Sequence, residues 1–171
     1  TAAAVSGVLN RADQTAADAW YQTPSASEGN IVLVGIDQKA LEDIGPFQNW
    51  GRDTMAMVIE ALNESEDCHP AVIAVDVLYA GETDPEKDAW LAEAAGKYRN
   101  VVTACAAEFG SEFHIQENGN TWWDDFAVTA FDEPYSELKA GTAQGHINAM
   151  LDADGILRHS LWSVTTPDNT E

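Results

Sequence analysis

The sequence has few basic residues. Among its 171 residues, 8 are Lys or Arg and 29 are Asp or Glu, so the formal net charge is −21. A surface of this charge repels phosphate backbones and anionic lipid headgroups, and we therefore expect no nucleic-acid partner. The charge favours cations, basic ligands or basic protein surfaces, but solubility alone also explains it.

Cysteines are scarce as well, because Cys68 and Cys105 are the only two. Cys68 precedes a predicted strand and Cys105 lies near the end of the next one. In parallel neighbouring strands these positions would be on the order of 20 Å apart. A disulfide requires Cα atoms within about 7 Å, so we expect two free thiols.

Long hydrophobic runs are missing. The longest, Ile31–Ile36 and Ala71–Val77, have the length of strands and fall short of the roughly 18 apolar residues of a membrane span. No basic segment followed by an apolar one opens the sequence, so we expect no signal peptide within it. The first residue is Thr1 and not Met, which leads us to expect a fragment whose targeting segments lie outside it.

Familiar catalytic signatures are also missing, including the P-loop, GxGxxG, GxSxG and HExxH patterns. The four histidines show no close metal-ligand spacing. Asp152-Ala153-Asp154-Gly155 resembles the opening of a calcium loop, but Ile156 and Ser163 stand where such a loop needs oxygen ligands. We interpret this segment as a hairpin turn, and we expect no catalytic residue, no metal and no cofactor.

Strands and helices alternate in the first two thirds of the sequence. Apolar runs at Ile31–Asp37, Ala71–Val77 and Val101–Ala106 are typical of strands buried on both faces of a parallel sheet. Asp37 is a candidate N-cap for a helix that stops at Gly45, and Asp84 with Pro85 predicts the start of another. A further helix is expected from near Asp53. The pattern predicts an α/β fold with a parallel three-strand core and crossover helices.

After Glu108 the pattern changes to hairpins. Asn118-Gly119 is a strong turn signal between two short strand-like segments. A short helix is expected around Tyr135–Lys139, and Gly145–Ala149 with Ile156–Val164 predicts a C-terminal antiparallel hairpin. The predicted sheet is therefore mixed. Near the start, the apolar spacing of residues 5–20 predicts a helix.

One cluster of residues suggests a binding site. Parallel strands ending at Asp37 and Asp76 would bring two carboxylates to one sheet edge, where ligands bind in open α/β sheets. Arg52 is a natural counter-charge for both, and Trp50 could cover it. We expect Arg52 within hydrogen-bonding distance of Asp37 or Asp76. A ligand site and a structural ion-pair network both fit these residues, and the sequence leaves the two open.

These segments together resemble a known family, the second type of CHASE domain (cyclase- and histidine-kinase-associated sensory extracellular). The resemblance extends over roughly residues 15–162, and its order and spacing are specific. Its segments are Asp18–Gln22, Ile31–Asp37, Gly45–Arg52, Ala71–Tyr79, Gly145–Asn148 and Asp152–Arg158. Phe47-Gln48-Asn49 departs from the family, which often has a proline-flanked Trp there.

The resemblance implies an extracytoplasmic sensor domain of a bacterial membrane receptor, on the extracellular side of the cell membrane. Residues 1–22 would be a helix linked to a preceding membrane segment, and residues 30–165 the sensor domain, with a hairpin insertion at 110–125. Flanking helices would tether the domain to the membrane, and a kinase or cyclase output module would lie inside the cell. Asn148 joins Asp37, Trp50, Arg52 and Asp76 as a ligand-binding candidate.

Three points stay open from the sequence. The signal is an unknown small molecule or protein. The N-terminal helix either packs on the domain or pairs with its counterpart in a homodimer. Two other classes of function also fit: a metal-assisted hydrolase using Asp37 and Asp76 as acid and base, and a structural interaction module.

Overall fold

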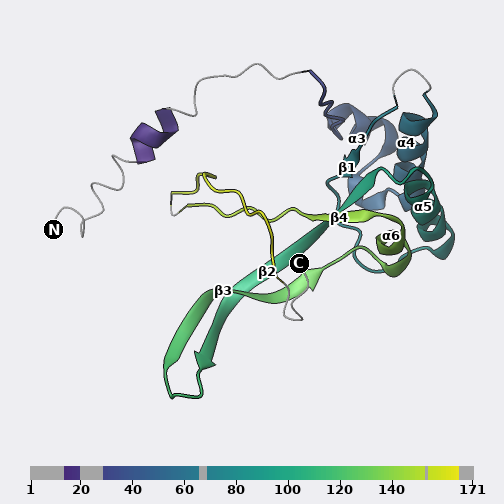
Figure 1. Ribbon diagram of the computed structural model, residues 1–171. Coiled ribbons are helices and arrows are strands. Elements are labelled where there is room, and N and C mark those ends of the chain that lie inside the picture. Colours follow the sequence, from purple (N-terminus) through teal and green to yellow (C-terminus); the bar gives the residue numbers. More distant parts are fainter. Residues whose placement is uncertain (1–13, 20–28, 66–68, 153, 166–171) are drawn as a thin grey trace. The chain divides into compact units, whose positions relative to one another are not determined.

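The computed structural model describes residues 14–19, 29–65, 69–152 and 154–165 of the chain (Figure 1). The chain divides into two compact units, Thr1–Gly45 and Pro46–Glu171. Among the described residues, no helix combines the length and the apolar character that a membrane crossing needs.

The described residues of the first unit, 14–19 and 29–45, contain two helical segments. Residues 14–19 are helical, and the rest of the helix predicted over residues 5–20 lies outside the described residues. α3 (Gln38–Ile44) begins after Asp37, whose side chain accepts a hydrogen bond of 2.9 Å from the backbone N–H of Ala40. Gly45 ends the helix with a φ of +106°, a conformation that favours glycine. The predicted cap and stop are both confirmed.

The apolar run at Ile31–Asp37 forms no strand, and its side chains are exposed, with Leu33 93% accessible. The prediction of a parallel strand there was wrong. Apolar composition shows that a segment suits a buried strand, but a strand forms only where its backbone groups meet a neighbouring strand. The third position in the parallel sheet belongs instead to β4 (Ala143–His146), at the other end of the sequence.

The second unit is built on a parallel sheet of β1 (Ile73–Val75), β2 (Val101–Ile115) and β4. β2 lies in the middle of these three strands, with Val75 of β1 in register with Thr103, and His146 of β4 in register with Cys105. β2 also forms an antiparallel hairpin with β3 (Thr121–Asp132). The fold is therefore mixed α/β, as predicted.

β2 is longer than the sequence suggested, because the predicted third strand and the first arm of the predicted hairpin are one continuous strand. The hairpin turn is confirmed at Asn118-Gly119. Gly119 adopts a φ of +82°, and the Asn118 side chain accepts a hydrogen bond of 2.9 Å from the backbone N–H of Asn120. Figure 1 shows β2 and β3 running on together as a two-stranded ribbon.

Helices pack around the parallel part of the sheet. α4 (Arg52–Glu64) packs on α5 (Pro85–Tyr98), and α5 packs on α6 (Ser136–Gly141); a short 3₁₀ turn, η1 (Phe47–Asn49), precedes α4. Asp84 caps α5 as predicted, because its carboxylate accepts hydrogen bonds from the backbone N–H groups of Glu86 and Lys87. The buried core comprises Ala56, Ile59, Val75, Leu91, Ala94, Ala95, Val101, Tyr135 and Leu138.

The predicted C-terminal hairpin is present as a turn with one antiparallel bridge, between Met150 and His159. The turn is closed by a hydrogen bond of 3.0 Å from the Asp152 N–H to the Ile156 carbonyl, and Gly155 has a φ of +81°. Ala153 lies outside the described residues. The segment thus turns where predicted but forms no extended ladder over residues 149–152 and 154–165.

Cys105 lies on β2, is buried and carries a free thiol, as predicted. Burial raises the pKa of this thiol. Cys68 lies outside the described residues, so its state stays a prediction.

Candidate functional site

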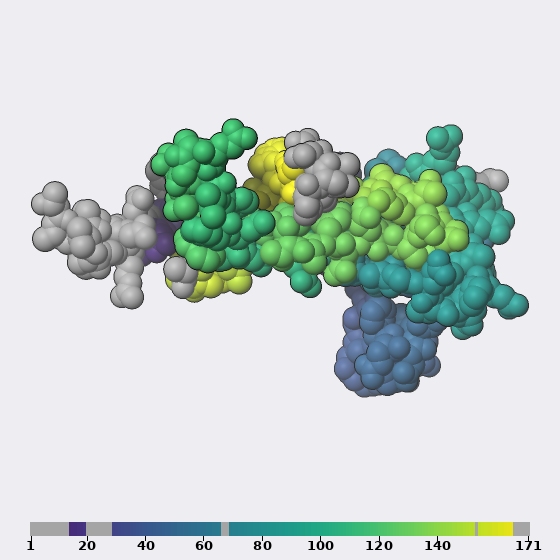
Figure 2. Space-filling view, turned by 90° about the horizontal axis from the view of Figure 1, so that it is seen from below, coloured from purple at the N-terminus to yellow at the C-terminus, as the bar shows by residue number. Residues whose placement is uncertain are grey.

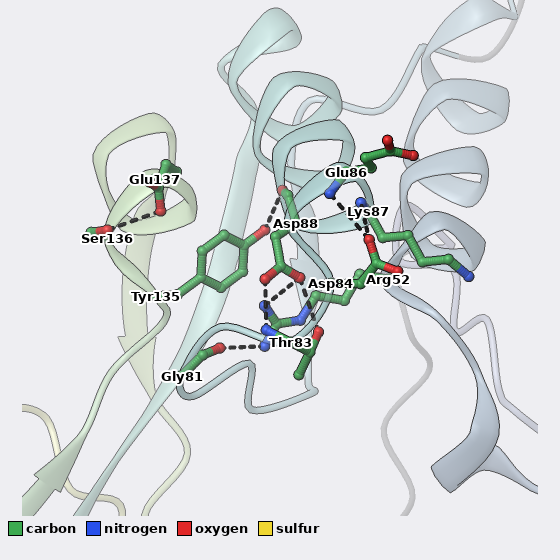
Figure 3. Close-up of polar contacts among 10 residues, drawn as sticks. All are labelled: Arg52, Gly81, Thr83, Asp84, Glu86, Lys87, Asp88, Tyr135, Ser136 and Glu137. Atoms are coloured by element: carbon green, nitrogen blue, oxygen red, sulfur yellow. Dashed lines mark hydrogen bonds and ion pairs between the residues drawn. The ribbon is translucent and has the colours of Figure 1, made fainter.

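Arg52 is the first residue of α4, and its side chain is buried. Its guanidinium forms an ion pair with the carboxylate of Asp88 on α5, with 2.7 Å between Nη1 and Oδ1. Nη2 also donates a hydrogen bond of 2.5 Å to the backbone carbonyl of Gly81, in the loop before α5. Figure 3 shows these groups converging between the two helices. The sequence analysis expected Asp37 or Asp76 as the partner, whereas within the second unit Arg52 pairs with Asp88 and not with Asp76.

The Asp88 carboxylate is also held by Thr83. The Thr83 backbone N–H donates to Oδ2 at 2.7 Å, and its hydroxyl donates to Oδ1 at 3.0 Å. Burial by itself raises the pKa of Asp88, but the Thr83 hydrogen bonds and the Arg52 charge lower it, and the net result is a pKa below the usual value. Both carboxylate oxygens are thus engaged by groups of the chain, and the charged form is stabilised.

Two tyrosines enclose the guanidinium. Its Cζ atom lies 4.3 Å from the ring centroid of Tyr135 and 5.6 Å from that of Tyr79, within the range of cation–π attraction. The Tyr135 hydroxyl donates a hydrogen bond of 2.7 Å to the backbone carbonyl of Asp88. Burial raises the pKa of each tyrosine to about 12, although the Arg52 charge acts in the opposite direction. Both phenols are therefore neutral at physiological pH and act as donors or apolar cover.

Together these contacts connect four parts of the second unit: the start of α4, the loop at residues 79–83, the first turns of α5 and the segment before α6. We define this set as the Arg52 cluster: Arg52, Tyr79, Gly81, Thr83, Asp88 and Tyr135. Its charges are satisfied within the chain, so the geometry favours the structural interpretation of Arg52 over direct contact with a ligand.

Asp37 belongs to the first unit and Asp76 to the second. Asp37 follows a segment that is not a strand, and its carboxylate caps α3. Asp76 directly follows β1 and is exposed. The predicted juxtaposition depended on a parallel strand at Ile31–Asp37, and that strand is not formed.

Trp50 precedes α4 and is half-buried. Its ring packs edge-to-face against Phe47, with 5.4 Å between the ring centroids. Such a pair adds about 0.5–1.5 kcal/mol beyond area burial, so it fixes the η1 turn that leads into Arg52. Trp50 therefore lies two residues before Arg52 and helps to fix the conformation of the turn before α4.

Asn148 extends the sheet beyond the end of β4. Its side-chain amide donates a hydrogen bond of 2.6 Å to the Ala107 carbonyl and accepts one of 2.8 Å from the Ala107 N–H. The Ile147 N–H donates to the Cys105 carbonyl at 2.9 Å, which continues the same ladder. The Asn148 amide thus replaces a strand residue opposite β2, a structural role that sequence reasoning did not foresee.

The sequence model of the CHASE2 domain matches residues 1–169. This chain belongs to the CHASE2 family. CHASE2 domains are sensory domains, typically the extracytoplasmic input of signalling proteins, and are not themselves catalytic. No curated protein and no solved structure matches the chain.

A second charged group of this CHASE2 domain lies in the C-terminal turn. The Arg158 guanidinium forms ion pairs with Asp152 at 2.7 Å and with Asp154 at 2.9 Å. A hydrogen bond from Arg158 is the main reason why the pKa of Asp154 is lowered. The two carboxylates that resembled a calcium loop are thus both paired with one arginine. Among the described residues, no three His, Cys, Asp or Glu side chains are grouped to hold a metal ion.

Asp88, Tyr79 and Tyr135 of this CHASE2 domain were not singled out from the sequence. The sequence pattern nevertheless pointed to Asp88, because Asp88 lies three residues before Leu91 on the buried face of α5. Arg52 similarly lies four residues before Ala56 on the buried face of α4. Two opposite charges that each occupy the apolar stripe of an adjacent helix predict a buried pair, because an unpaired buried charge is costly. The tyrosines carry no comparable signal.

Proposed function

We propose that this CHASE2 domain is the extracytoplasmic signal-input domain of a bacterial transmembrane receptor, tethered through flanking membrane helices. It binds an unidentified signal and relays that event to an intracellular kinase or cyclase module. The observation that carries the proposal is the family match over residues 1–169. The excess of acidic residues favours a basic ligand or a basic partner over an anionic one.

The Arg52 cluster supports the proposed relay because it couples the movements of neighbouring elements. A signal can pass through a domain only if a displacement at one element moves another. α4, α5 and the segment before α6 are joined here by a buried ion pair and by hydrogen bonds to backbone carbonyls. A displacement of α4 would therefore carry α5 with it.

The proposed extracytoplasmic location of the domain can be tested by cysteine labelling. In the intact receptor, Cys68 and Cys105 are replaced by Ser and one exposed residue, Glu42, is changed to Cys. A membrane-impermeant maleimide added to whole cells should label Glu42→Cys. A receptor that keeps Cys105 as its sole cysteine is the buried control and should react only after unfolding. Labelling of Glu42→Cys only after cell lysis would place the domain in the cytoplasm and contradict the proposal.

The proposed ligand contacts of Asp76 and Trp50 can be tested by substitution. Asp76 is exposed at the carboxyl end of β1, where ligands bind in open α/β sheets, and Trp50 is half-buried just before α4. In the intact receptor, Asp76→Asn and Trp50→Phe should weaken the response to the signal while the melting temperature of the domain changes little. Asp84→Asn, which retains the oxygen that caps α5, is the matched control. A normal response in both variants would remove these residues from the site.

A further inference from the structure

The outer part of the β2–β3 hairpin, residues 108–132, is a two-stranded ribbon that we call the arm, and most of its residues are exposed. Over this stretch β3 pairs with β2, and no other strand of the described residues pairs with β3. Two register shifts interrupt the ladder, between Glu108 and Phe109 and between Gly110 and Glu112. A long strand edge of this kind presents unpaired backbone groups that can accept another chain.

Large apolar side chains gather on one face of the arm near its tip. Phe113 lies opposite Trp123 in register, and their ring centroids are 5.1 Å apart. Ile115 follows on the same face, because alternate residues of a strand share a face. Trp123 is 63% exposed and Ile115 is 71% exposed. In the space-filling view of Figure 2 the green residues of the arm lie open on the face shown.

The opposite face of the tip is acidic. Glu112 lies opposite Asp124 in register, and next to them the rings of His114 and Trp122 stack with centroids 4.5 Å apart. The whole arm contains no Lys or Arg. Its acidic residues are Glu108, Glu112, Glu117, Asp124, Asp125 and Asp132.

The acidic charge and the apolar side chains of the arm together limit which kinds of partner can bind to it. A second copy of the arm would bring carboxylates of like charge together, which is unfavourable in paired strands. Anionic lipids and nucleic acids are repelled for the same reason. A segment that carries Lys or Arg beside apolar side chains would neutralise the carboxylates and cover Phe113 and Trp123. It could also form cation–π contacts with the exposed tryptophans.

We propose that the arm is a docking surface for a cationic, partly apolar segment of another protein, which lies along β3 and against Phe113 and Trp123. The proposal concerns a protein partner and does not depend on the membrane orientation or on the identity of the signal. Docking of a strand or an extended segment on a sheet edge is a recurrent mode of recognition, with affinity from the main chain and specificity from alternate side chains.

The test uses the whole chain and a synthetic probe, an octapeptide of alternating Lys and Leu. Isothermal titration calorimetry measures its binding at low and moderate salt, with a Glu–Leu octapeptide as the charge-reversed control. We expect the Lys–Leu peptide to bind and the Glu–Leu peptide not to bind. The Phe113→Ala/Trp123→Ala double variant should weaken binding by about tenfold or more, the scale of an interface anchor. Trp162→Ala removes an exposed tryptophan outside the arm and should leave binding within about twofold of the unchanged chain.

A second variant tests the proposal even if the Phe113→Ala/Trp123→Ala substitutions unfold the hairpin. Asp124→Asn/Asp125→Asn keeps the side-chain oxygens that accept hydrogen bonds from the Phe126 N–H and the Ser111 hydroxyl. It should weaken binding and reduce the salt dependence, whereas Glu42→Gln/Asp43→Asn on α3 makes the same charge change outside the arm and should have a smaller effect. Circular dichroism checks that each variant is folded.

Three outcomes would overturn the proposal. Equal losses in the arm variants and their controls would mean that the peptide responds only to the total charge. A dimer in sedimentation analysis that the Phe113→Ala/Trp123→Ala variant dissolves would make a second copy the occupant. A blue shift of tryptophan fluorescence with phosphatidylcholine vesicles, lost in the same variant, would assign the arm to a lipid surface.

Discussion

Arg52 of α4 and Asp88 of α5 form an ion pair of 2.7 Å in which the two side chains are 8% and 7% exposed. They lie at the beginnings of two adjacent helices, and the loop between β1 and α5 adds its own hydrogen bonds to both. The pair therefore joins elements that are separated in sequence. Breaking this pair should cost more stability than breaking a surface salt bridge, because a buried charge that loses its partner is left without solvation.

Arg52→Ala should destabilise the domain strongly. Removing the guanidinium leaves the Asp88 carboxylate buried with the Thr83 hydrogen bonds alone, and loss of one partner of a buried pair costs about 3–5 kcal/mol. Arg52→Lys should recover only part of this, because an ammonium cannot reproduce the planar fork that serves Asp88 and Gly81 together. Urea unfolding measures the free energies.

The Lys87–Asp53 ion pair provides the matched control. Its side chains are 42% and 28% exposed, and its N–O distance is 3.1 Å. Lys87→Ala should cost about 1 kcal/mol or less, as exposed pairs do. Equal losses for Arg52→Ala and Lys87→Ala would contradict the assignment of Arg52 as the buried anchor.

Much of the local structure could be predicted because it is set by neighbouring residues. The Asp37 cap, the Gly45 stop, the Asp84-Pro85 helix start and the Asn118-Gly119 turn each follow from side chains that satisfy nearby backbone groups. The mixed α/β class also followed from the order of these elements. Such features require no knowledge of the tertiary structure.

Features that depend on distant residues were predicted poorly. The run at Ile31–Asp37 is one of the most apolar segments of the sequence, yet the third parallel strand is Ala143–His146, which has few apolar residues and is positioned by its pairing with β2. The Arg52 partner was misassigned because an arginine can reach several carboxylates, and which one lies in reach depends on how α4 packs on α5. Asn148 was proposed as a ligand contact, whereas the structure uses its amide to pair with the Ala107 backbone.

Acid should weaken the fold through Asp88. Its pKa is lowered in the folded state, so it stabilises the fold fully above the unfolded value, which is about 3.9 for an aspartate. This contribution is lost as the pH falls through the folded pKa. The free energy of unfolding, measured between pH 6 and pH 3, should therefore fall less steeply in Asp88→Asn than in the unchanged chain. Identical pH profiles would show that the Asp88 charge adds no stability.

Asn148→Ala should destabilise the end of the sheet. The substitution leaves the N–H and carbonyl of Ala107, a buried residue, without the two hydrogen bonds that Asn148 provides. The expected loss is about 1–3 kcal/mol in the free energy of unfolding. Asn49→Ala removes the same side chain at an exposed position and should change the stability little. A stable Asn148→Ala variant with impaired signalling would instead restore Asn148 as a ligand contact.

The packing of α5 on α6 can be tested at two glycines that face each other. A Cβ atom at Gly141 would lie 3.3 Å from the Gly96 Cα, which is tighter than most real contacts, and 3.5 Å from the Ala92 carbonyl oxygen, an ordinary contact distance. A Cβ at Gly96 would lie 3.6 Å from the Gly141 Cα, an ordinary contact distance. The two positions therefore differ in the space that they offer to a methyl group, although each glycine is next to the other.

Gly141→Ala should consequently destabilise the domain by roughly 1 kcal/mol, because backbone atoms that cannot rotate away must separate. Gly96→Ala should be neutral or stabilising by up to about 1 kcal/mol, since alanine favours the helix and the methyl group fits. Thermal and urea unfolding of the two single variants measure the difference, and each serves as the other's control. Equal stabilisation by both substitutions would show that α5 and α6 are not in close contact at these residues.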